Sequence, residues 1–186
     1  MLVALSTTDF PGMLPVYRRI IAALSTLAVD AVVTTGGVDL GGPLTGAPNV
    51  EVRGWVGHDG LLPAMDLVIG HGGHSTTMKA LANGVPLLVI PVNPISDQRQ
   101  VGRAVAAAGI GATLRRGAGT PELRAMISAL LGNTAVRDAA AAAGIRLRAT
   151  PSGAEVAAAR LLAVIRDGRA ARPSGSARGP AGPRSA

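Results

Sequence analysis

The sequence has no cysteine, very few aromatic residues and no long apolar run, and each absence excludes a class of protein. Without cysteine the chain can form neither a disulfide framework nor a thiolate metal site. Aromatic residues make up 2% of the chain and hydrophobic residues 48%, so a core must be built from alanine, valine, leucine and isoleucine. No run approaches the roughly 18 apolar residues of a membrane span, and the N-terminus lacks the basic start of a secretory signal. We therefore expect a cytoplasmic protein without an integral membrane segment.

The net charge of +7 raises the question of a nucleic-acid partner, but the location of the charge argues against one. Four arginines lie in the segment 169–186, which has no acidic residue, and removing these four leaves +3 for the rest. This segment is rich in proline, glycine, serine and alanine, so we expect a disordered tail after a single domain, 1–168. The stacking aromatics of single-strand binders are absent from it. A solvated tail is favoured over contact with RNA or acidic lipid, and no nucleic-acid partner is predicted.

Short apolar runs alternate with helical patterns, which is typical of an α/β fold with a parallel sheet and right-handed crossovers. The predicted strands are Leu2–Ser6, Ala31–Thr35, Val50–Arg53, Asp66–Ile69, Leu87–Ile90 and Ile110–Leu114. The predicted helices are Pro15–Leu27, a short one ending at Gly84, Asp97–Ala108, Pro121–Leu131, Thr134–Leu147 and Ser152–Ile165, with a helical turn at Asp59–Pro63. In such sheets ligands bind beyond the carboxyl ends of the strands. Four polar glycine turns are expected there: Ser6–Gly12, Gly36-Gly37, Gly54–His58 and His71–Ser75.

The turn at His71 has the composition of a phosphate site. Gly72 and Gly73 allow close approach of the backbone, and the N-terminus of the following helix supplies N–H donors and positive potential. The His71 imidazole and the Ser75 and Thr76 hydroxyls can add further donors. Alternative interpretations are ordinary N-capping by the hydroxyl residues and a satisfied surface position for His71. A metal site using His71 and His74 is disfavoured because no third ligand is evident.

An acid–amide pair, Asp97-Gln98, opens a later helix. A carboxylate accepts hydrogen bonds from two adjacent hydroxyls, and an amide both donates and accepts, so the pair suits the diol of a hexose. The alternative for Asp97 is an ordinary N-cap.

These residues, taken in order, resemble a known signature. Trp55, His71, Gly73, Thr76, Gly84-Val85-Pro86, Pro91 and Asp97-Gln98 are similar to the nucleotide-sugar-binding motif of the UDP-glycosyltransferase superfamily, the inverting enzymes of the GT-B fold. The resemblance extends from Leu2 to about Ile165. It implies a Rossmann-like sheet flanked by helices and corresponds only to the C-terminal, donor-binding half of such an enzyme.

The resemblance also implies roles for individual residues. The Trp55 ring would stack on the nucleobase while the Val56 backbone bonds the base edge; the alternative is that Trp55 caps the core. Ser6, Thr7 and Thr8 would contact the diphosphate, as would His71. Three departures stand out. Gly57 and His58 replace the Pro and Gln that often follow the tryptophan, and the loop from Pro91 to Asp97 is two residues longer than the commonest form. Lys79 stands where many members have a ribose-binding glutamate, and because a lysine cannot accept hydrogen bonds, we assign it no ribose role.

The implied reaction is transfer of a hexose from a UDP- or TDP-sugar to the hydroxyl of a small-molecule acceptor, without metal or other cofactor. A histidine of the N-terminal domain would be the general base, so no catalytic residue is assigned in this chain. We expect it to need an acceptor-binding domain or chain and to have little or no transferase activity alone. The open alternatives are an enzyme fragment, the donor-binding subunit of a split glycosyltransferase, and a non-catalytic nucleotide-sugar-binding module, with a nucleotide-sugar isomerase less favoured.

Overall fold

The computed structural model describes residues 1–170, which form parts of two compact units, Met1–Ala149 and Thr150–Ala186. The predicted domain, 1–168, therefore includes all of the first unit and all but the last two residues of the one helix described in the second, α6 (Gly153–Ala170), so the predicted tail begins two residues before this helix ends. Residues 171–186 of the predicted tail lie outside the described residues.

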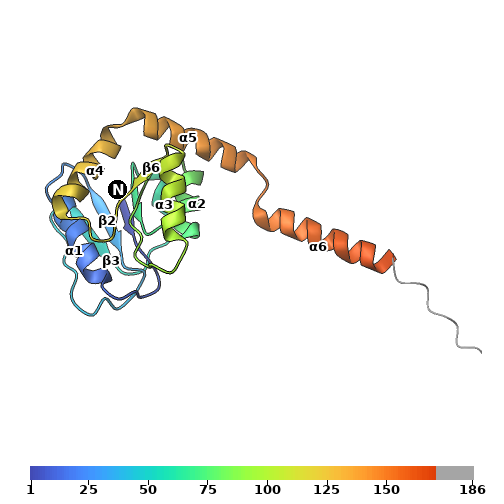
Figure 1. The fold of residues 1–186 in the computed structure, drawn as a ribbon, viewed down its shortest axis with the longest axis horizontal. Helices are drawn as coiled ribbons and strands as arrows, with labels where there is room; N and C mark the ends of the chain where they lie inside the picture. Colours follow the sequence, from blue (N-terminus) through green and yellow to red (C-terminus); the bar gives the residue numbers. More distant parts are fainter. Residues whose placement is uncertain (171–186) are drawn as a thin grey trace, which may run out of the picture. The chain divides into compact units, whose positions relative to one another are not determined.

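The first unit is built on a six-stranded parallel sheet in the order β3-β2-β1-β4-β5-β6 (Figure 1). The strands are β1 (Leu2–Ala4), β2 (Ala31–Thr34), β3 (Val50–Arg53), β4 (Val68–Gly70), β5 (Leu87–Val89) and β6 (Gly111–Thr113). The predicted parallel α/β fold is confirmed, and each predicted strand contains or overlaps an observed one. Strand order reverses between β1 and β4, and such a reversal opens a crevice at the carboxyl ends of the strands.

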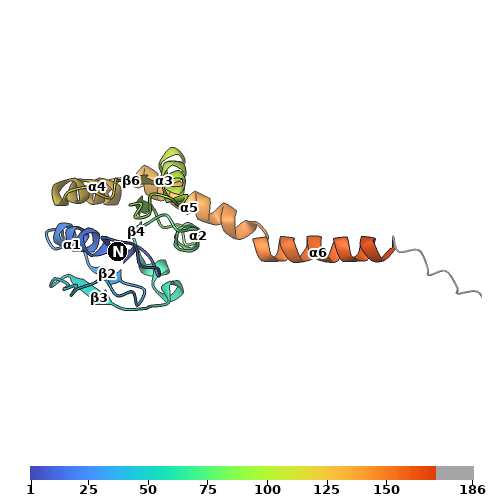
Figure 2. The same cartoon turned by 60° about the horizontal axis from the view of Figure 1, so that its bottom comes forward.

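Helices cover both faces of the sheet. On one face α1 (Met13–Leu24) packs against α4 (Thr120–Gly132), and on the other α2 (His74–Ala82) packs against α5 (Thr134–Ala149), with α3 (Gln98–Ala107) against β5 and β6 (Figures 1 and 2). Successive residues of a strand point to opposite faces. Val3 and Ile69 accordingly join the α1/α4 core, while Leu2 and Val68 join the α2/α3/α5 core. Strands buried on both sides explain the unbroken apolar runs of the sequence.

Helix ends follow local chemistry where they differ from the prediction. The helix predicted over Pro15–Leu27 is α1, which ends at Leu24; the hydroxyls of Ser25 and Thr26 then bond back to the carbonyls of Ala22 and Ala23. The predicted turn at Asp59–Pro63 is two short 3-10 helices, η1 (His58–Gly60) and η2 (Leu62–Ala64).

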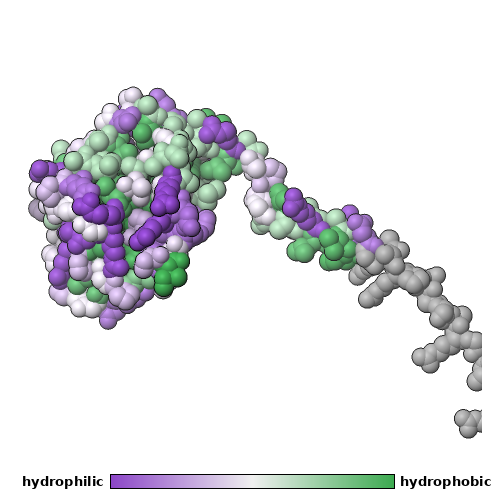
Figure 3. Space-filling model, viewed as in Figure 1, coloured by the Kyte–Doolittle hydropathy of each residue, from purple (hydrophilic) through white to green (hydrophobic). Residues whose placement is uncertain are grey.

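The second unit's helix, α6, begins with a capping box. The Ser152 hydroxyl accepts from the Glu155 N–H (3.2 Å), while the Glu155 carboxylate accepts from the Ser152 N–H (2.9 Å). The Ser152 hydroxyl also donates to the carboxylate (2.9 Å), and the bonds from the Ser152 N–H and hydroxyl lower the pKa of Glu155. Apolar side chains remain exposed on α6, among them Leu161, Leu162 and Val164, and Figure 3 shows this apolar surface in green.

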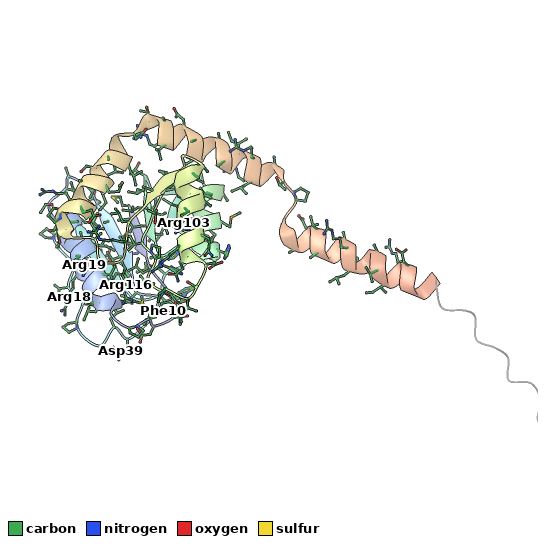
Figure 4. All side chains as sticks on the ribbon, in the orientation of Figure 1. Phe10, Arg18, Arg19, Asp39, Arg103 and Arg116 are labelled. Carbon is green, nitrogen blue, oxygen red and sulfur yellow. The ribbon has the colours of Figure 1, made fainter. Side chains whose placement is uncertain are left out.

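Arginines hold the loops of the first unit. Arg19 donates to the carbonyls of Arg116 (2.7 Å) and Ala118 (3.0 Å), and Arg116 donates to the carbonyls of Val92 (3.0 Å) and Pro11. Figure 4 labels Arg19 and Arg116 on one face of the unit, and Figure 3 shows hydrophilic residues gathered on that face. Arg116 thus ties the loops after β1, β5 and β6 together, and Arg19 fixes the last of these loops to α1.

Candidate functional site

A cavity of about 500 Å³ opens at the carboxyl ends of β1, β2, β3 and β4, beside the strand-order reversal. Eight of the ten predicted site residues line it: Ser6, Thr7, Trp55, Val56, His71, Gly73, Ser75 and Thr76. They come from three loops and the start of α2, so the fold brings together segments separated by up to 70 residues. The other two, Asp97 and Gln98, do not line this cavity.

The loop after β1 forms the first wall. The Ser6 hydroxyl accepts from the Thr8 N–H (2.9 Å), which closes a tight turn and leaves Thr7 exposed. Gly36, with a φ of +68°, approaches this loop so closely that a side chain would come within 2.7 Å of the Ser6 carbonyl. Only glycine fits both that conformation and that space.

Tyr17 of α1 supports the same wall from beneath. Its hydroxyl donates to the Thr34 carbonyl (3.0 Å) and accepts from the Leu5 N–H (3.4 Å), which ties the ends of β1 and β2 together. Burial raises the pKa of Tyr17 to about 12, although the hydrogen bonds to the backbone oppose the shift. The sequence analysis assigned no role to this residue, the only tyrosine of the chain.

His71 follows β4 and is half-buried at the base of the cavity. Its Nδ1 is the one buried side-chain nitrogen or oxygen of the described residues that has no hydrogen-bond partner. Burial lowers the pKa of His71 below 6.5, against a smaller opposing effect of the Ala4 carbonyl, so the unliganded imidazole is neutral at pH 7. A satisfied surface histidine, the alternative interpretation, does not fit this environment. A buried polar atom without a partner is costly unless a ligand pairs with it.

Gly73 holds the His71 ring in place by having no side chain. A Cβ at Gly73 would lie 2.5 Å from Cε1 and Nε2 of the imidazole. Gly72, with a φ of +89°, in turn approaches the Gln98 carbonyl, where a Cβ would stand 2.9 Å away. Packing against the His71 ring and against the Gln98 carbonyl therefore requires glycine at both positions, independently of any ligand.

The helix α2 starts at His74 with Gly73 as its N-cap, and no side chain caps it. Ser75 and Thr76 lie within the first turn, and their hydroxyls have no hydrogen-bond partner among the described residues. The capping alternative for these hydroxyls is therefore not what the structure adopts. The N-terminal N–H groups of α2 and the two hydroxyls remain available to an anion.

Trp55 and Val56 form the outer wall, after β3. The Trp55 side chain is 73% exposed, so it does not cap the core, contrary to the alternative interpretation. It presents an accessible aromatic ring at the mouth of the cavity.

Asp97 and Gln98 differ in their surroundings. The exposed Asp97 carboxylate lies 3.5 Å from Nδ1 of His74; Asp97 occupies the N-cap position of α3 but makes no capping hydrogen bond. Gln98 is buried, and its Oε1 accepts from the N–H groups of Val92 (2.8 Å) and Asn93 (2.9 Å). This bonding closes the Pro91–Asp97 loop, a structural role that the sequence analysis did not include.

His58, Asp59 and Lys79 are among the further residues that line the cavity and that had no predicted role in the site. The Lys79 ammonium is 2.9 Å from the Asp59 carboxylate. Nε2 of His58 is 3.3 Å from the Thr34 hydroxyl, which itself donates to the Val3 carbonyl (3.2 Å), so His58 is the donor in this pair. The pKa of His58 is lowered, first by burial and then by Lys79. In the sequence, His58 and Lys79 stood out only as departures from the family motif, and no signal pointed to Asp59 as a site residue.

Within residues 1–170, no cluster of three or more histidine, aspartate or glutamate side chains is arranged to hold a metal ion. Over the same residues, no helix combines the length and apolar character needed to cross a bilayer.

Comparisons with known proteins give a consistent result. Residues 18–164 match the family model described as Erythromycin biosynthesis protein CIII-like, C-terminal domain. The elloramycin glycosyltransferase ElmGT of Streptomyces olivaceus is 36% identical over 129 residues, which are 69% of this chain and 32% of that protein. The demethyllactenocin mycarosyltransferase of Streptomyces fradiae is 42% identical over 89 residues, 47% of this chain and 18% of that protein. The chain thus spans a third or less of these relatives.

Solved structures agree. CalG4, the calicheamicin glycosyltransferase, superposes with a TM-score of 0.74 at 26% identity, over 92% of this chain and 44% of that one. The spinosyn rhamnosyltransferase SpnG, complexed with thymidine diphosphate, gives 0.69 at 27% identity, over 90% of this chain and 44% of that one. The six-stranded sheet with its flanking helices is the Rossmann-like C-terminal domain of GT-B glycosyltransferases.

Proposed function

The chain belongs to the family of Erythromycin biosynthesis protein CIII-like C-terminal domains, and from this we propose that it is the donor-binding domain of an inverting hexosyltransferase. The observation that carries the proposal is the cavity at the switch point, which is lined by the half-buried imidazole of His71, the hydroxyl residues Ser75 and Thr76 and the exposed aromatic ring of Trp55. A nucleoside diphosphate has the matching parts, an aromatic base and an anionic diphosphate.

The proposed ligand lies across the cavity from wall to wall. The base stacks on Trp55 and bonds the Val56 backbone, while the diphosphate sits at the N-terminus of α2 with His71 and the hydroxyls of that turn. Ser6 and Thr7 contact the diphosphate from the opposite wall. The hexose extends toward Asp97, whose exposed carboxylate retains free lone pairs.

In the proposed reaction the acceptor oxygen forms a bond to the anomeric carbon as the bond to the diphosphate oxygen breaks, with inversion. The electron pair of the broken bond goes to the leaving diphosphate. Its developing charge is stabilised by the α2 N-terminus and by donation from His71. The acceptor's proton goes to a base outside this cavity, because all three histidines of the sequence line the donor site. We therefore propose that transfer requires an acceptor-binding domain or chain.

The relatives inform the identity of the donor and acceptor. SpnG has been solved with thymidine diphosphate and with spinosyn aglycone, and both structures are 27% to 28% identical to this chain. We propose a TDP- or UDP-sugar as donor and a small-molecule hydroxyl as acceptor. A cytoplasmic location remains a prediction from the sequence.

Isothermal titration of the chain with UDP, TDP and their hexose conjugates tests the donor site. We expect at least one of these ligands to bind, and we expect each nucleotide to compete with its hexose conjugate. Trp55→Ala should weaken binding, because the stacking of the base is lost. The matched control is Met78→Ala, an exposed residue of α2 that does not line the cavity. Failure of every one of these nucleotides and nucleotide sugars to bind would exclude the proposed function.

Complementation tests the need for a second domain. The chain is mixed with the acceptor-binding half of a family member, and sugar transfer is followed by mass spectrometry. We expect transfer from the mixture and little or none from either part. Robust transfer by the chain alone would contradict this part of the proposal, and binding without any transfer in the mixtures would favour a non-catalytic module.

A further inference from the structure

We propose that Asp59, held in place by Lys79, binds the ribose hydroxyls of the nucleotide. This inference rests on the proposed function and extends it, because it assigns a nucleoside-specificity residue that the sequence signature does not contain.

The two residues come from opposite walls of the cavity. Asp59 lies in η1, four residues after Trp55, and Lys79 lies in α2, one turn after Ser75. The Lys79 ammonium is 2.9 Å from each oxygen of the Asp59 carboxylate, so the pair joins the wall that begins at Trp55 to the wall that carries the phosphate-facing hydroxyls. In a nucleotide the ribose connects base and diphosphate. The ion pair therefore lies between the two ends assigned to them.

The chemistry of the pair suits hydroxyl groups. Asp59 is the one acidic residue among those that line the cavity, and Lys79 is the only lysine in the sequence. A carboxylate offers about four lone-pair sites and can accept from hydroxyls while it is bound to an ammonium group. The Asp59 side chain is 76% exposed, so acceptor sites on its carboxylate remain accessible.

A lysine partner also answers an electrostatic problem. An unpaired carboxylate close to a diphosphate would repel it. Lys79 offsets that charge and holds the Asp59 carboxylate in place. Lys79 is thus a positioning residue, while Asp59 touches the ligand.

The neighbouring His58 supports this arrangement of η1. Its imidazole is fixed to the buried Thr34 hydroxyl at 3.3 Å, directly beside Asp59. Burial and then Lys79 lower the pKa of His58, while Asp59 opposes the shift, and all three side chains line the same cavity.

The test compares UDP with 2′,3′-dideoxy-UDP by calorimetry, so that only the ribose hydroxyls differ. We expect the unaltered chain to bind the dideoxy nucleotide about tenfold more weakly, the effect of losing one hydrogen bond to a charged group. In Asp59→Ala, UDP should bind about tenfold more weakly while the dideoxy nucleotide binds as before. Lys79→Met, which keeps an unbranched side chain without the charge, should reduce the difference in affinity between UDP and the dideoxy nucleotide. Lys79→Arg, which keeps the charge, should preserve that difference.

The matched control is Glu122→Ala, which removes an exposed ion pair of the same length, 2.9 Å to Arg115, outside this cavity. Its discrimination between the two nucleotides should stay that of the unaltered chain. Equal weakening of both nucleotides in Asp59→Ala would overturn the inference and leave only a structural clip between η1 and α2. Unchanged binding of both nucleotides in Asp59→Ala would overturn it too, while continued UDP binding would keep the proposed function. Absence of UDP binding to the unaltered chain would overturn the inference, and the proposed function would fall with it only if TDP and the nucleotide sugars also failed to bind.

Discussion

Replacing His71 by alanine should weaken the binding of a nucleoside diphosphate much more than the binding of the free nucleoside. Nδ1 of His71 is buried and has no partner in the protein, so a ligand oxygen that pairs with it gains a hydrogen bond without breaking an existing one. A hydrogen bond to a charged group is worth about 1.5 to 3 kcal/mol, which corresponds to about 10- to 100-fold in Kd. We expect His71→Ala to weaken UDP by that factor and uridine hardly at all.

The same residue should make binding depend on pH. Burial holds the pKa of the free His71 below 6.5, and a bound diphosphate, being anionic, should raise it. Protonation therefore accompanies binding, and affinity should rise as the pH falls from the pKa of the complex to that of the free chain. His71→Gln keeps a donor but cannot titrate, so it should retain part of the affinity and lose the pH dependence.

The assay is calorimetry between about pH 8 and pH 5, with a UDP-hexose as ligand. A sugar conjugate is chosen because the terminal phosphate of UDP itself titrates near pH 6 and would mask the histidine. Met78→Ala is the control on the same helix. Equal weakening of nucleotide and nucleoside in His71→Ala, or an unchanged pH profile in His71→Gln, would refute the reasoning.

Three further substitutions test how the site is supported. Gly73→Ala should weaken UDP binding severalfold, because the added Cβ would lie 2.5 Å from Cε1 and Nε2 of His71 and would push the ring out of its position. A near-normal Kd would show that the ring has room to move. Tyr17→Phe should lower the free energy of unfolding by about 1 to 2 kcal/mol in urea titrations, since a buried carbonyl of β2 and an N–H beyond β1 lose their partner. Because the folded pKa of Tyr17 is raised to about 12, the unaltered chain should also lose stability as pH rises above 10, and Tyr17→Phe should lose less; equal alkaline profiles would argue against this. Gln98→Leu should cost about 2 to 3 kcal/mol in the same unfolding assay by leaving two N–H groups unpaired, and an unchanged midpoint would exclude a structural role for the amide.

Much of the fold and part of the site could be predicted because the relevant signals are local. A continuous apolar run such as Leu87–Ile90 indicates a strand covered on both faces wherever it occurs, and Gly109 ends a helical pattern by its own conformation. The predicted ends were less accurate. The strand predicted from Asp66 begins at Val68, because pairing with β1 and β5, and not composition, decides where a ladder starts.

By itself the sequence determined the alternation of strands and helices, the polar turns at the strand ends and the order of the motif from Trp55 to Gln98. These depend on residue type and spacing, which the chain carries before it folds. Only the tertiary structure decided which groups are free and which are already occupied. Gln98 is engaged by its own loop, the Ser75 hydroxyl is open, and Asp59 meets Lys79 across twenty residues of chain. Such contacts depend on which loops the sheet brings together in space, and a local sequence pattern does not contain that information.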